Sequence, residues 1–230
     1  MYADVKAMKK AAAEKAVDDY VKDGMTVGLG TGSTAYYVIK KVGELVTGKG
    51  YKLKCVTTSE ESERLAKECG IPTFDLNDVG PIDITIDGAD EVDPQNNLIK
   101  GLGGALLREK IVAAASMSEI IVVDESKVVE KLGTKAPLPV EVLKFGHLKT
   151  AYGLKLQGCE PALRMKDGQP FVTDGGNYIY DCTFPDGIDK AYFKELAIDS
   201  IPGVVECGLF LNRTTAAIIA HADGTLEVRE

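Results

Sequence analysis

The sequence is poor in the residues on which disulfide, zinc and histidine-dependent chemistry usually relies. It contains two histidines and five cysteines, and no two cysteines form a Cys-x-x-Cys pair. An odd, scattered set of cysteines predicts buried thiols in a reducing compartment, not a disulfide framework or a zinc site. With so few histidines, a catalytic cysteine that needs a histidine partner is disfavoured as well.

The chain also lacks long hydrophobic runs, internal repeats and an excess of basic residues. No stretch approaches the ~20 apolar residues of a membrane span, and the N-terminus mixes lysine with acids, unlike a signal or transit peptide. The formal net charge is -8, which argues against nucleic acid or an anionic membrane as the main partner. We expect a cytoplasmic protein, or an organellar one after removal of a targeting peptide.

What the sequence does have is a strong alternation of short apolar strands and amphipathic helices up to about residue 133. Hydrophobic residues make up 45% of the 230 positions, enough for a buried core. The alternation predicts a Rossmann-like α/β fold, in which a mostly parallel sheet carries helices on both faces.

The pattern changes after Gly133. Gly/Asp turns separate expected strands near 152–156, 162–165 and 178–182, and a helix is expected at 190–198. We predict a smaller inserted α+β domain, ferredoxin-like, and a return of the strand 216–220 to the first sheet. The predicted domains are therefore 1–133 with 207–230, the α/β catalytic domain, and 134–206, the inserted α+β domain.

The first chemically informative segment is Gly-Leu-Gly-Thr-Gly-Ser-Thr at 28–34, between a predicted strand and a predicted helix. Glycines let the backbone approach a ligand, and the start of a helix offers free N–H groups to an anion. Ser33 and Thr34 add hydroxyl donors. The segment has neither the spacing of a dinucleotide-binding fingerprint nor the Gly-Lys-Ser/Thr of a P-loop. A plain capped turn is therefore an equally good interpretation of the segment alone.

The second segment, 87–93, holds four acids in seven residues after an apolar strand. Ligands of open α/β sheets bind at the carboxyl ends of the strands. Gly88 and Ala89 keep the turn small, so that Asp87 and Asp90 can both face a crevice. A solvated acidic turn and a magnesium site are the alternatives, since clustered carboxylates suit hard cations.

The third segment, 100–110, runs from a lysine through a glycine turn into a helix. At ~100° per residue, Glu109 falls on an apolar arc with Leu106 and Val112. A carboxylate in such a setting is partly desolvated, the condition under which it becomes a stronger general base. The alternative is a surface glutamate paired with a neighbouring basic residue.

The fourth segment, Asp124-Glu-Ser-Lys127, ends another apolar strand and brings a lysine that can meet a phosphate. Alone, Lys127 would be interpreted as a solvated lysine. The four segments are expected at four successive strand ends, where they would line one crevice with N–H groups, hydroxyls, lysines and carboxylates. That set suits acid–base chemistry on a small phosphorylated polyol. His147 and His221 lie outside these segments and are expected to be structural or at the surface.

Taken in order, these motifs resemble the ribose-5-phosphate isomerase A family over nearly the whole chain. The similar segments are Gly30-Thr-Gly-Ser-Thr34, Thr57-Thr-Ser59, Asp87-Gly-Ala-Asp-Glu91, Lys100-Gly-Leu-Gly-Gly-Ala-Leu-Leu-Arg-Glu-Lys110, Asp124-Glu-Ser-Lys127, Thr173-Asp-Gly-Gly-Asn177 and Gly208-Leu-Phe210. Two positions depart from the family: Leu102 stands where glycine is usual, and Gly175 where asparagine is common. Leu102 puts a side chain beside the loop that would hold an oxyanion, where it can alter how closely the backbone approaches substrate.

The resemblance implies an aldose–ketose isomerase of carbohydrate metabolism, in the pentose phosphate pathway. Such an enzyme interconverts D-ribose 5-phosphate and D-ribulose 5-phosphate through an enediolate, without a metal or an organic cofactor. The resemblance implies that Glu109 moves the proton between C2 and C1 and that Lys100 stabilises the oxyanion. Asp87, assisted by Asp90, would handle hydroxyl protons and ring opening. The implied substrate-binding residues are Thr31, Gly32, Ser33, Thr34, Asp87, Gly88, Ala89, Asp90, Lys100, Gly101, Leu102, Gly103 and Lys127.

The family also implies a homodimer or a larger homo-oligomer. Two other functions stay open at this point. A non-catalytic sugar-phosphate sensor would need an attached DNA-binding module, and the N-terminal helix supplies no helix-turn-helix pair. A magnesium-dependent phosphate enzyme would use Asp87 and Asp90 as metal ligands.

Overall fold

The computed structural model describes Tyr2 and residues 4–230. The described chain folds into two compact units. Unit 1 comprises the described residues up to Ala89 together with 108–127 and 213–230, and unit 2 comprises 90–107 and 128–212. Within the part of the chain that is described, no helix has both the length and the apolar character needed to cross a membrane.

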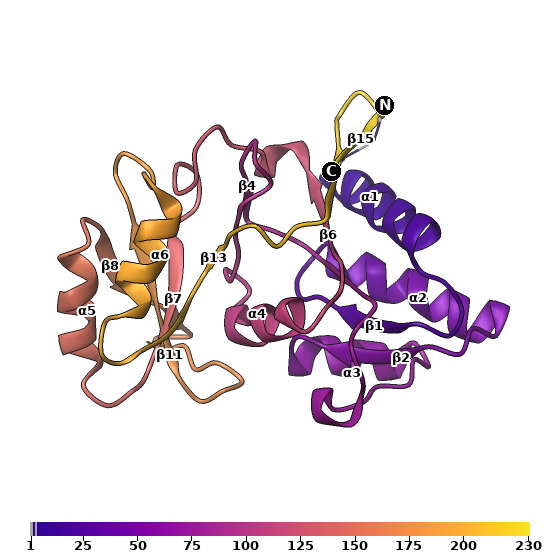
Figure 1. The fold of residues 1–230 in the computed structure, drawn as a ribbon, viewed down its shortest axis with the longest axis horizontal. Coiled ribbons are helices and arrows are strands. Elements are labelled where there is room, and N and C mark those ends of the chain that lie inside the picture. Colours follow the sequence, from indigo (N-terminus) through magenta and orange to yellow (C-terminus); the bar gives the residue numbers. More distant parts are fainter. Residues whose placement is uncertain (1, 3) are drawn as a thin grey trace. The chain divides into compact units, whose positions relative to one another are not determined.

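Unit 1 is built on a six-stranded sheet in the order β15-β14-β6-β3-β1-β2 (Figure 1). Its strands are β1 (Thr26–Leu29), β2 (Lys54–Thr57), β3 (Ile84–Asp87), β6 (Glu119–Asp124), β14 (Ala216–Ala220) and β15 (Leu226–Arg229). Neighbouring strands run parallel, except that β15 is antiparallel to β14. The predicted mostly parallel sheet is confirmed, including the return of 216–220 to it.

Helices cover both faces of this sheet. They are α1 (Val5–Tyr20), α2 (Ala35–Lys49), α3 (Glu60–Glu68) and α4 (Leu106–Ala114), of which the part from Arg108 belongs to unit 1. Successive strand residues point to opposite faces. On β2, Cys55 joins the core with α1 and α2, whereas Val56 packs with Val112 of α4.

The larger part of unit 2 has the element order of a ferredoxin-like domain, β-α-β-β-α-β. The elements are β7 (Leu138–Val142), α5 (His147–Lys155), β8 (Glu160–Leu163), β11 (Tyr178–Thr183), α6 (Ala191–Asp199) and β12 (Val204–Cys207). The four strands form an antiparallel sheet in the order β12-β7-β11-β8. A short hairpin of β9 (Met165–Lys166) and β10 (Gln169–Pro170) lies between β8 and β11 in the chain. The expected α+β type of this unit is confirmed.

The strand expected at 152–156 is wrong, because most of this segment belongs to α5. Tyr152, Leu154 and Leu156 alternate with other residues, a pattern typical of a strand with one buried face. In the structure Leu154 is buried, but Tyr152 and Leu156 are 65% and 68% exposed. The apolar alternation therefore reflects exposed aromatic and leucine side chains on and after a helix.

Unit 2 also holds a three-stranded antiparallel sheet that the sequence pattern did not predict. It consists of β4 (Glu91–Val92), β5 (Leu98–Ile99) and β13 (Leu209–Phe210), in the order β13-β5-β4. Because β5 pairs with both β4 and β13, 90–107 joins the compact unit that contains β13, whereas the predicted boundaries placed it with the first sheet. Those boundaries stay a prediction about independently folding domains.

The small sheet also contains the strand that precedes one of the four motifs. Lys100 follows β5, a strand of this three-stranded sheet, and not a strand of the six-stranded sheet. The Lys100 segment therefore follows a strand end, as predicted, but that strand belongs to a different sheet from the strands before the other three motifs.

Candidate active site

Three of the four motifs follow adjacent parallel strands of unit 1. The glycine loop at 28–34 continues β1, Asp87 ends β3, and Asp124 ends β6. Strand β3 lies between β1 and β6. The three motifs therefore share one edge of the sheet, the edge at which open α/β sheets bind ligands.

The Asp87 carboxylate is buried, with 1% of the residue exposed, and it is oriented by backbone donors. Its Oδ1 accepts hydrogen bonds from the N–H groups of Thr31, at 3.0 Å, and Gly88, at 2.7 Å. A Cβ on Gly30 would lie 2.0 Å from this oxygen, so only glycine allows the loop to pass so close. Local backbone geometry thus fixes the direction of the carboxylate.

Hydroxyl groups of the Thr57–Ser59 motif hold the glycine loop from within unit 1. The Thr31 Oγ1 lies 2.6 Å from Thr58 Oγ1 and donates to Ser59 Oγ at 2.9 Å. Ser62 Oγ donates to the carbonyl of Gly30 at 2.7 Å. Both polar groups of Thr31 that could meet a substrate, its N–H and its hydroxyl, have protein partners, so its contact with substrate stays a prediction.

A basic residue that was not among the sequence-predicted site residues contacts the outer end of the glycine loop. Lys9 of α1 donates from Nζ to Ser33 Oγ at 2.9 Å. Gly32 has a φ of +102°, a left-handed conformation that glycine adopts without strain. Thr34 is buried and immediately precedes α2. No sequence spacing links Lys9 to Ser33, because the two residues lie on separate elements 24 positions apart.

Glu109 is 5% exposed and shares a helix with the buried side chains of Leu106 and Val112. The predicted placement of Glu109 on a buried arc of the helix is confirmed. Its neighbour Arg108 faces another environment: the guanidinium pairs with Glu60 of α3 at 3.7 Å. Glu109 and Arg108 are consecutive in the helix, yet the carboxylate is buried and the guanidinium is partly exposed.

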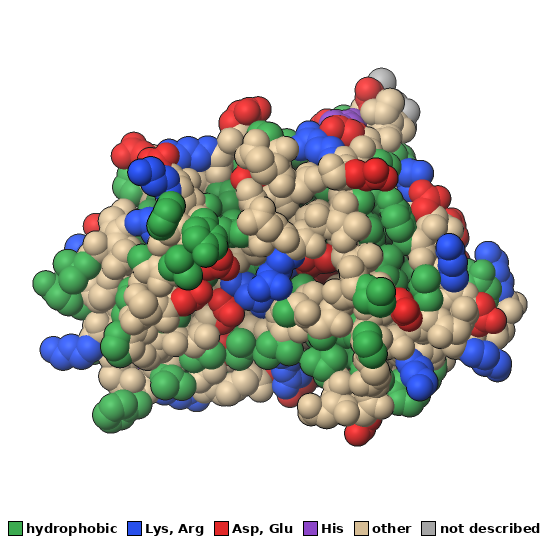
Figure 2. Space-filling view, in the orientation of Figure 1, with side chains coloured by type: hydrophobic (Ala, Val, Ile, Leu, Met, Phe, Trp, Pro, Cys, Tyr) green, Lys and Arg blue, Asp and Glu red, His purple; other side chains and the backbone are tan. Residues whose placement is uncertain are grey.

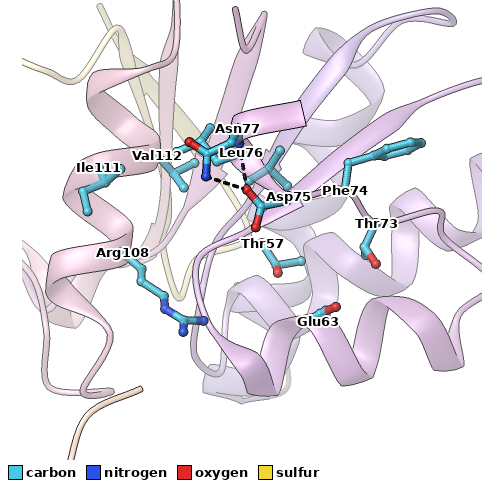
Figure 3. A pocket seen from close by; sticks show the side chains of 11 residues that line it. Thr57, Glu63, Thr73, Phe74, Asp75, Leu76, Asn77, Arg108, Ile111 and Val112 are labelled. Carbon is cyan, nitrogen blue, oxygen red and sulfur yellow. Dashed lines mark hydrogen bonds between the residues drawn. The ribbon is translucent and has the colours of Figure 1, made fainter. Parts of the chain in front are cut away.

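Arg108 lines a cavity of about 430 Å³ on unit 1 (Figure 3). Figure 3 shows Arg108, Ile111 and Val112 of α4 on one side and the loop with Asp75 and Asn77 on the other. The Asn77 side chain donates to Asp75 Oδ1 at 2.9 Å. None of the sequence-predicted site residues lines this cavity.

Lys127 ends a short 3-10 helix (η2, Glu125–Lys127) directly after β6. Asp124 is buried, and its Oδ1 accepts hydrogen bonds from the N–H and the hydroxyl of Ser126. His221, after β14, lies 3.1 Å from Glu125 through Nδ1. Through these contacts the turn that carries Lys127 is tied to two neighbouring strands of the sheet.

In unit 2, the Gly208-Leu-Phe210 motif positions the buried Lys100. The N–H of Lys100 donates to the carbonyl of Gly208 at 2.9 Å, and its ammonium lies 5.4 Å from the centre of the Phe210 ring. A Cβ on Gly208 would lie 2.3 Å from the Lys100 carbonyl oxygen. Glycine at 208 is therefore what allows the two segments to pair.

The loop after Lys100 accommodates Leu102 without backbone strain. The left-handed positions of the loop are Gly101, with φ +108°, and Gly104, with φ +86°, whereas Leu102 has no positive φ. The Leu102 side chain is exposed, and its N–H donates to Asp90 Oδ2 at 2.9 Å. The departure from the family at this position thus leaves the backbone that contacts Asp90 in an ordinary conformation.

The Thr173–Asn177 motif forms a turn of unit 2 whose side chains are hydrogen-bonded to Glu141. The Thr173 hydroxyl and the Asn177 amide donate to Glu141 Oε1 at 2.8 and 2.9 Å. Burial raises the pKa of Glu141. A Cβ on Gly175 would lie 3.3 Å from the same oxygen, so the second departure from the family leaves space beside a buried carboxylate.

Comparison with known proteins gives a consistent match. The family model for Ribose 5-phosphate isomerase A (phosphoriboisomerase A) matches residues 54–224. The chain is 49% identical over 220 residues to the Ribose-5-phosphate isomerase A of Bacillus mycoides (strain KBAB4), covering 96% of this chain and 98% of that protein. It is 50% identical over 226 residues to that of Gloeobacter violaceus, covering 98% and 96%.

Solved structures agree with this match. Ribose 5-phosphate isomerase from Plasmodium falciparum has a TM-score of 0.95 and 42% identity, over 98% of both chains. A D-ribose-5-phosphate isomerase in complex with phospho-erythronic acid has a TM-score of 0.95 and 39% identity, over 99% of both chains. This chain belongs to the ribose 5-phosphate isomerase A family, a family of isomerases.

Proposed function

We propose that this chain interconverts D-ribose 5-phosphate and D-ribulose 5-phosphate through an enediolate, as a step of the pentose phosphate pathway. Relatives named ribose-5-phosphate isomerase A that match almost its full length support this assignment. The structural observation that carries it is a pair of buried carboxylates in unit 1. Asp87 ends β3 and Glu109 lies in α4, and they are 1% and 5% exposed.

In the proposed mechanism Glu109 removes the proton from C2 of the open-chain sugar and returns it to C1. A carbon-bound proton is weakly acidic, so its removal needs a positioned base in a site from which water is excluded. The low exposure of Glu109 suits that role. Protons must also move between the hydroxyl oxygens O1 and O2, and a hydroxyl proton must move when the sugar ring opens. We assign these proton transfers to Asp87, assisted by Asp90.

Lys100 is proposed to stabilise the negative charge that develops on oxygen. A cation that is fixed in advance stabilises such charge without reorganisation during the reaction. Lys100 meets this condition, because its backbone N–H is hydrogen-bonded to the Gly208 carbonyl and its ammonium lies over the Phe210 ring. The neighbouring Gly101–Gly103 backbone is proposed to contact substrate hydroxyls.

The phosphate is proposed to bind at the start of α2. Backbone N–H groups at a helix start, together with the hydroxyls of Ser33 and Thr34, form an anion site. Lys127 is the proposed cation partner, and the approach of Lys9 to Ser33 supports a positively charged environment at this loop. Contacts from Thr31, Gly32, Gly88 and Ala89 belong to the same proposal.

We propose that the reaction needs neither a metal nor an organic cofactor. The test is formation of ribulose 5-phosphate by the purified chain in excess chelator, with and without added magnesium. We expect equal rates in both conditions. Loss of activity that magnesium restores would favour the magnesium-dependent alternative, and binding of ribose 5-phosphate without conversion would favour a sugar-phosphate sensor.

We further propose a cytoplasmic homodimer or larger homo-oligomer. Free thiols suit a reducing compartment, and all five cysteines are free. Large apolar side chains are exposed beside and on the helices of unit 2, as in Phe145 at 94%, Leu148 and Phe193, and Figure 2 shows hydrophobic side chains gathered over α6. Such patches mark interaction surfaces. Light scattering should give a mass of at least twice 24.6 kDa, and a monomer mass would contradict the proposal.

A further inference from the structure

The loop that follows Lys100 is held by one arginine from a distant part of unit 2, Arg164. We propose that Arg164 is a positioning residue of the isomerase reaction. It fixes the 101–104 loop so that Lys100, Asp90 and the loop N–H groups are presented to the substrate. The inference rests on the proposed function and assigns a role to a residue outside the motifs that the sequence singled out.

The guanidinium of Arg164 binds two successive carbonyl groups of the loop. Arg164 lies between β8 and β9, and its own N–H donates to the carbonyl of Ile179 at 2.8 Å. Its Nη1 donates to the carbonyl of Gly101 at 2.9 Å and to that of Leu102 at 3.1 Å. Both contacts are made by one nitrogen of a planar, rigid group, so they define the direction of both carbonyls together.

The guanidinium is itself immobilised on its other edge. Its Nε donates to Asp181 Oδ2 at 2.9 Å, and its Nη2 donates to Asp181 Oδ1 at 2.5 Å. Two-pronged pairs of this kind fix geometry as well as charge. The group also lies over the Phe171 ring, with 5.8 Å to the ring centre. Because Asp181 balances its charge, Arg164 contributes orientation more than attraction for a phosphate.

The Phe171 ring packs directly against the end of the 101–104 loop. A Cβ on Gly104 would lie 2.5 Å from the Phe171 ring, so glycine at 104 lets the ring support the end of the loop. The backbone N–H of Phe171 donates to the carbonyl of Arg164 at 2.8 Å. Arg164 and Phe171 thus form one rigid support.

The direction of the two carbonyls determines the direction of two N–H groups. In a trans peptide the N–H points opposite to the C=O. The peptide between Gly101 and Leu102 shows this directly, because its carbonyl meets Arg164 while its N–H donates to Asp90 Oδ2 at 2.9 Å. By the same geometry, the N–H of Gly103 points away from Arg164.

Two successive N–H groups directed to one side form a concavity suited to negative charge. One of them orients the Asp90 carboxylate, and the other is directed to the same side of the loop. Without Arg164, the Leu102 carbonyl would lose this contact, and the Gly101 carbonyl would keep the hydrogen bond from the Gly104 N–H at 2.9 Å. We therefore expect the Gly103 N–H to lose its orientation and the Leu102 N–H to hold the Asp90 carboxylate less firmly.

The test compares Arg164→Lys with the wild type and with Lys155→Ala, a matched control in the same unit. Lys155 makes an exposed pair with Glu160 at 3.3 Å. A lysine keeps the charge beside Asp181 but cannot reproduce the planar fork. We expect Arg164→Lys to lower kcat by about 10–100-fold, the order expected for a misplaced site, with inhibition by inorganic phosphate unchanged. Lys155→Ala should match the wild type in both.

A second variant separates positioning from folding. Arg164→Ala should lose a similar factor in kcat, and added ethylguanidinium should restore part of it, whereas ethylammonium should not. Arg164→Lys with wild-type kcat, or Arg164→Ala without selective rescue at an unchanged melting temperature, would overturn the inference. If Arg164→Ala does not fold, Arg164→Lys decides. A wild-type chain that fails to convert ribose 5-phosphate would refute the proposed function instead.

Discussion

The two units orient their candidate functional groups by different physical means. In unit 1, Asp87 and the glycine loop follow neighbouring parallel strands, and nearby N–H and hydroxyl groups set their geometry. In unit 2, the Lys100 loop follows a two-residue strand and is held by Gly208 and Arg164, both more than 60 positions away. A parallel sheet gathers the ends of its strands by topology. A small antiparallel sheet does not, so long-range contacts must supply the loop geometry.

Among the variants that compare the two units, the largest effects should come from adding one methyl group at a glycine that lies directly against a candidate site residue. Gly30→Ala would place Cβ 2.0 Å from Asp87 Oδ1, and Gly208→Ala would place it 2.3 Å from the Lys100 carbonyl. We expect kcat/KM to fall by roughly 100-fold in each variant. We also expect each to lose about 1–3 kcal/mol of stability, as overpacking does. Steady-state kinetics and chemical denaturation measure both quantities.

Gly48→Ala in α2 is the control, because nothing lies within 4 Å of its added Cβ. It should keep full activity and gain up to about 1 kcal/mol of stability from helix propensity. If Gly208→Ala behaved like this control while Gly30→Ala did not, the claimed dependence of the unit 2 loop on long-range contacts would be wrong.

Lys127→Ala sharpens the comparison by separating binding from chemistry. Lys127 is the proposed phosphate partner in unit 1, and a hydrogen bond to a charged group contributes about 1.5–3 kcal/mol. KM for ribose 5-phosphate should therefore rise by roughly 10–100-fold, with a smaller change in kcat. Lys149→Ala, at an exposed position of α5, is the control. An unchanged KM in Lys127→Ala would count against the phosphate role.

His221→Gln should give the smallest effect, and one that depends on pH. The hydrogen bond with Glu227, and more weakly that with Glu125, raises the pKa of His221 above its ordinary value. The stability from the charged histidine is fully present below about pH 6.5, the ordinary histidine pKa, and is lost as pH rises through the raised folded pKa.

Other charged groups near His221 are Asp223 and Arg229, the latter bonded to Glu227. Thermal melts across this pH range should therefore show His221→Gln about 1–2 °C less stable than the wild type at low pH, as for a weak surface ion pair. The two melting temperatures should converge at high pH. A difference that grows with pH would contradict the assigned sign.

The candidate site residues of unit 1 could be predicted because short-range rules govern their positions. Strand–helix alternation predicted the parallel sheet, and the strand-end rule then placed Asp87 and the glycine loop at one edge. Helical periodicity predicted the burial of Glu109, which the structure confirms. Each inference used neighbours in sequence, where periodicity carries real information.

The loop geometry around Lys100 in unit 2 could not be predicted, because its contacts join positions without a shared local pattern. The two-residue strands β4, β5 and β13 are too short to show a period. Arg164 reaches the loop from the link between β8 and β9, whose sequence gives no hint of that contact. Exposed apolar residues on and directly after α5 follow the alternation typical of a strand, so the strand predicted at 152–156 was wrong.

The central claim is that the buried carboxylate of Glu109 moves the proton between two carbons. Glu109→Gln, measured beside Glu68→Gln at an exposed position of α3, tests it most directly. We predict that kcat of Glu109→Gln falls by roughly 10²–10⁴-fold, while ribose 5-phosphate still binds with an affinity close to that of the wild type. Glu68→Gln should keep wild-type kcat. A Glu109→Gln enzyme that turns over ribose 5-phosphate at nearly the wild-type rate would contradict the account.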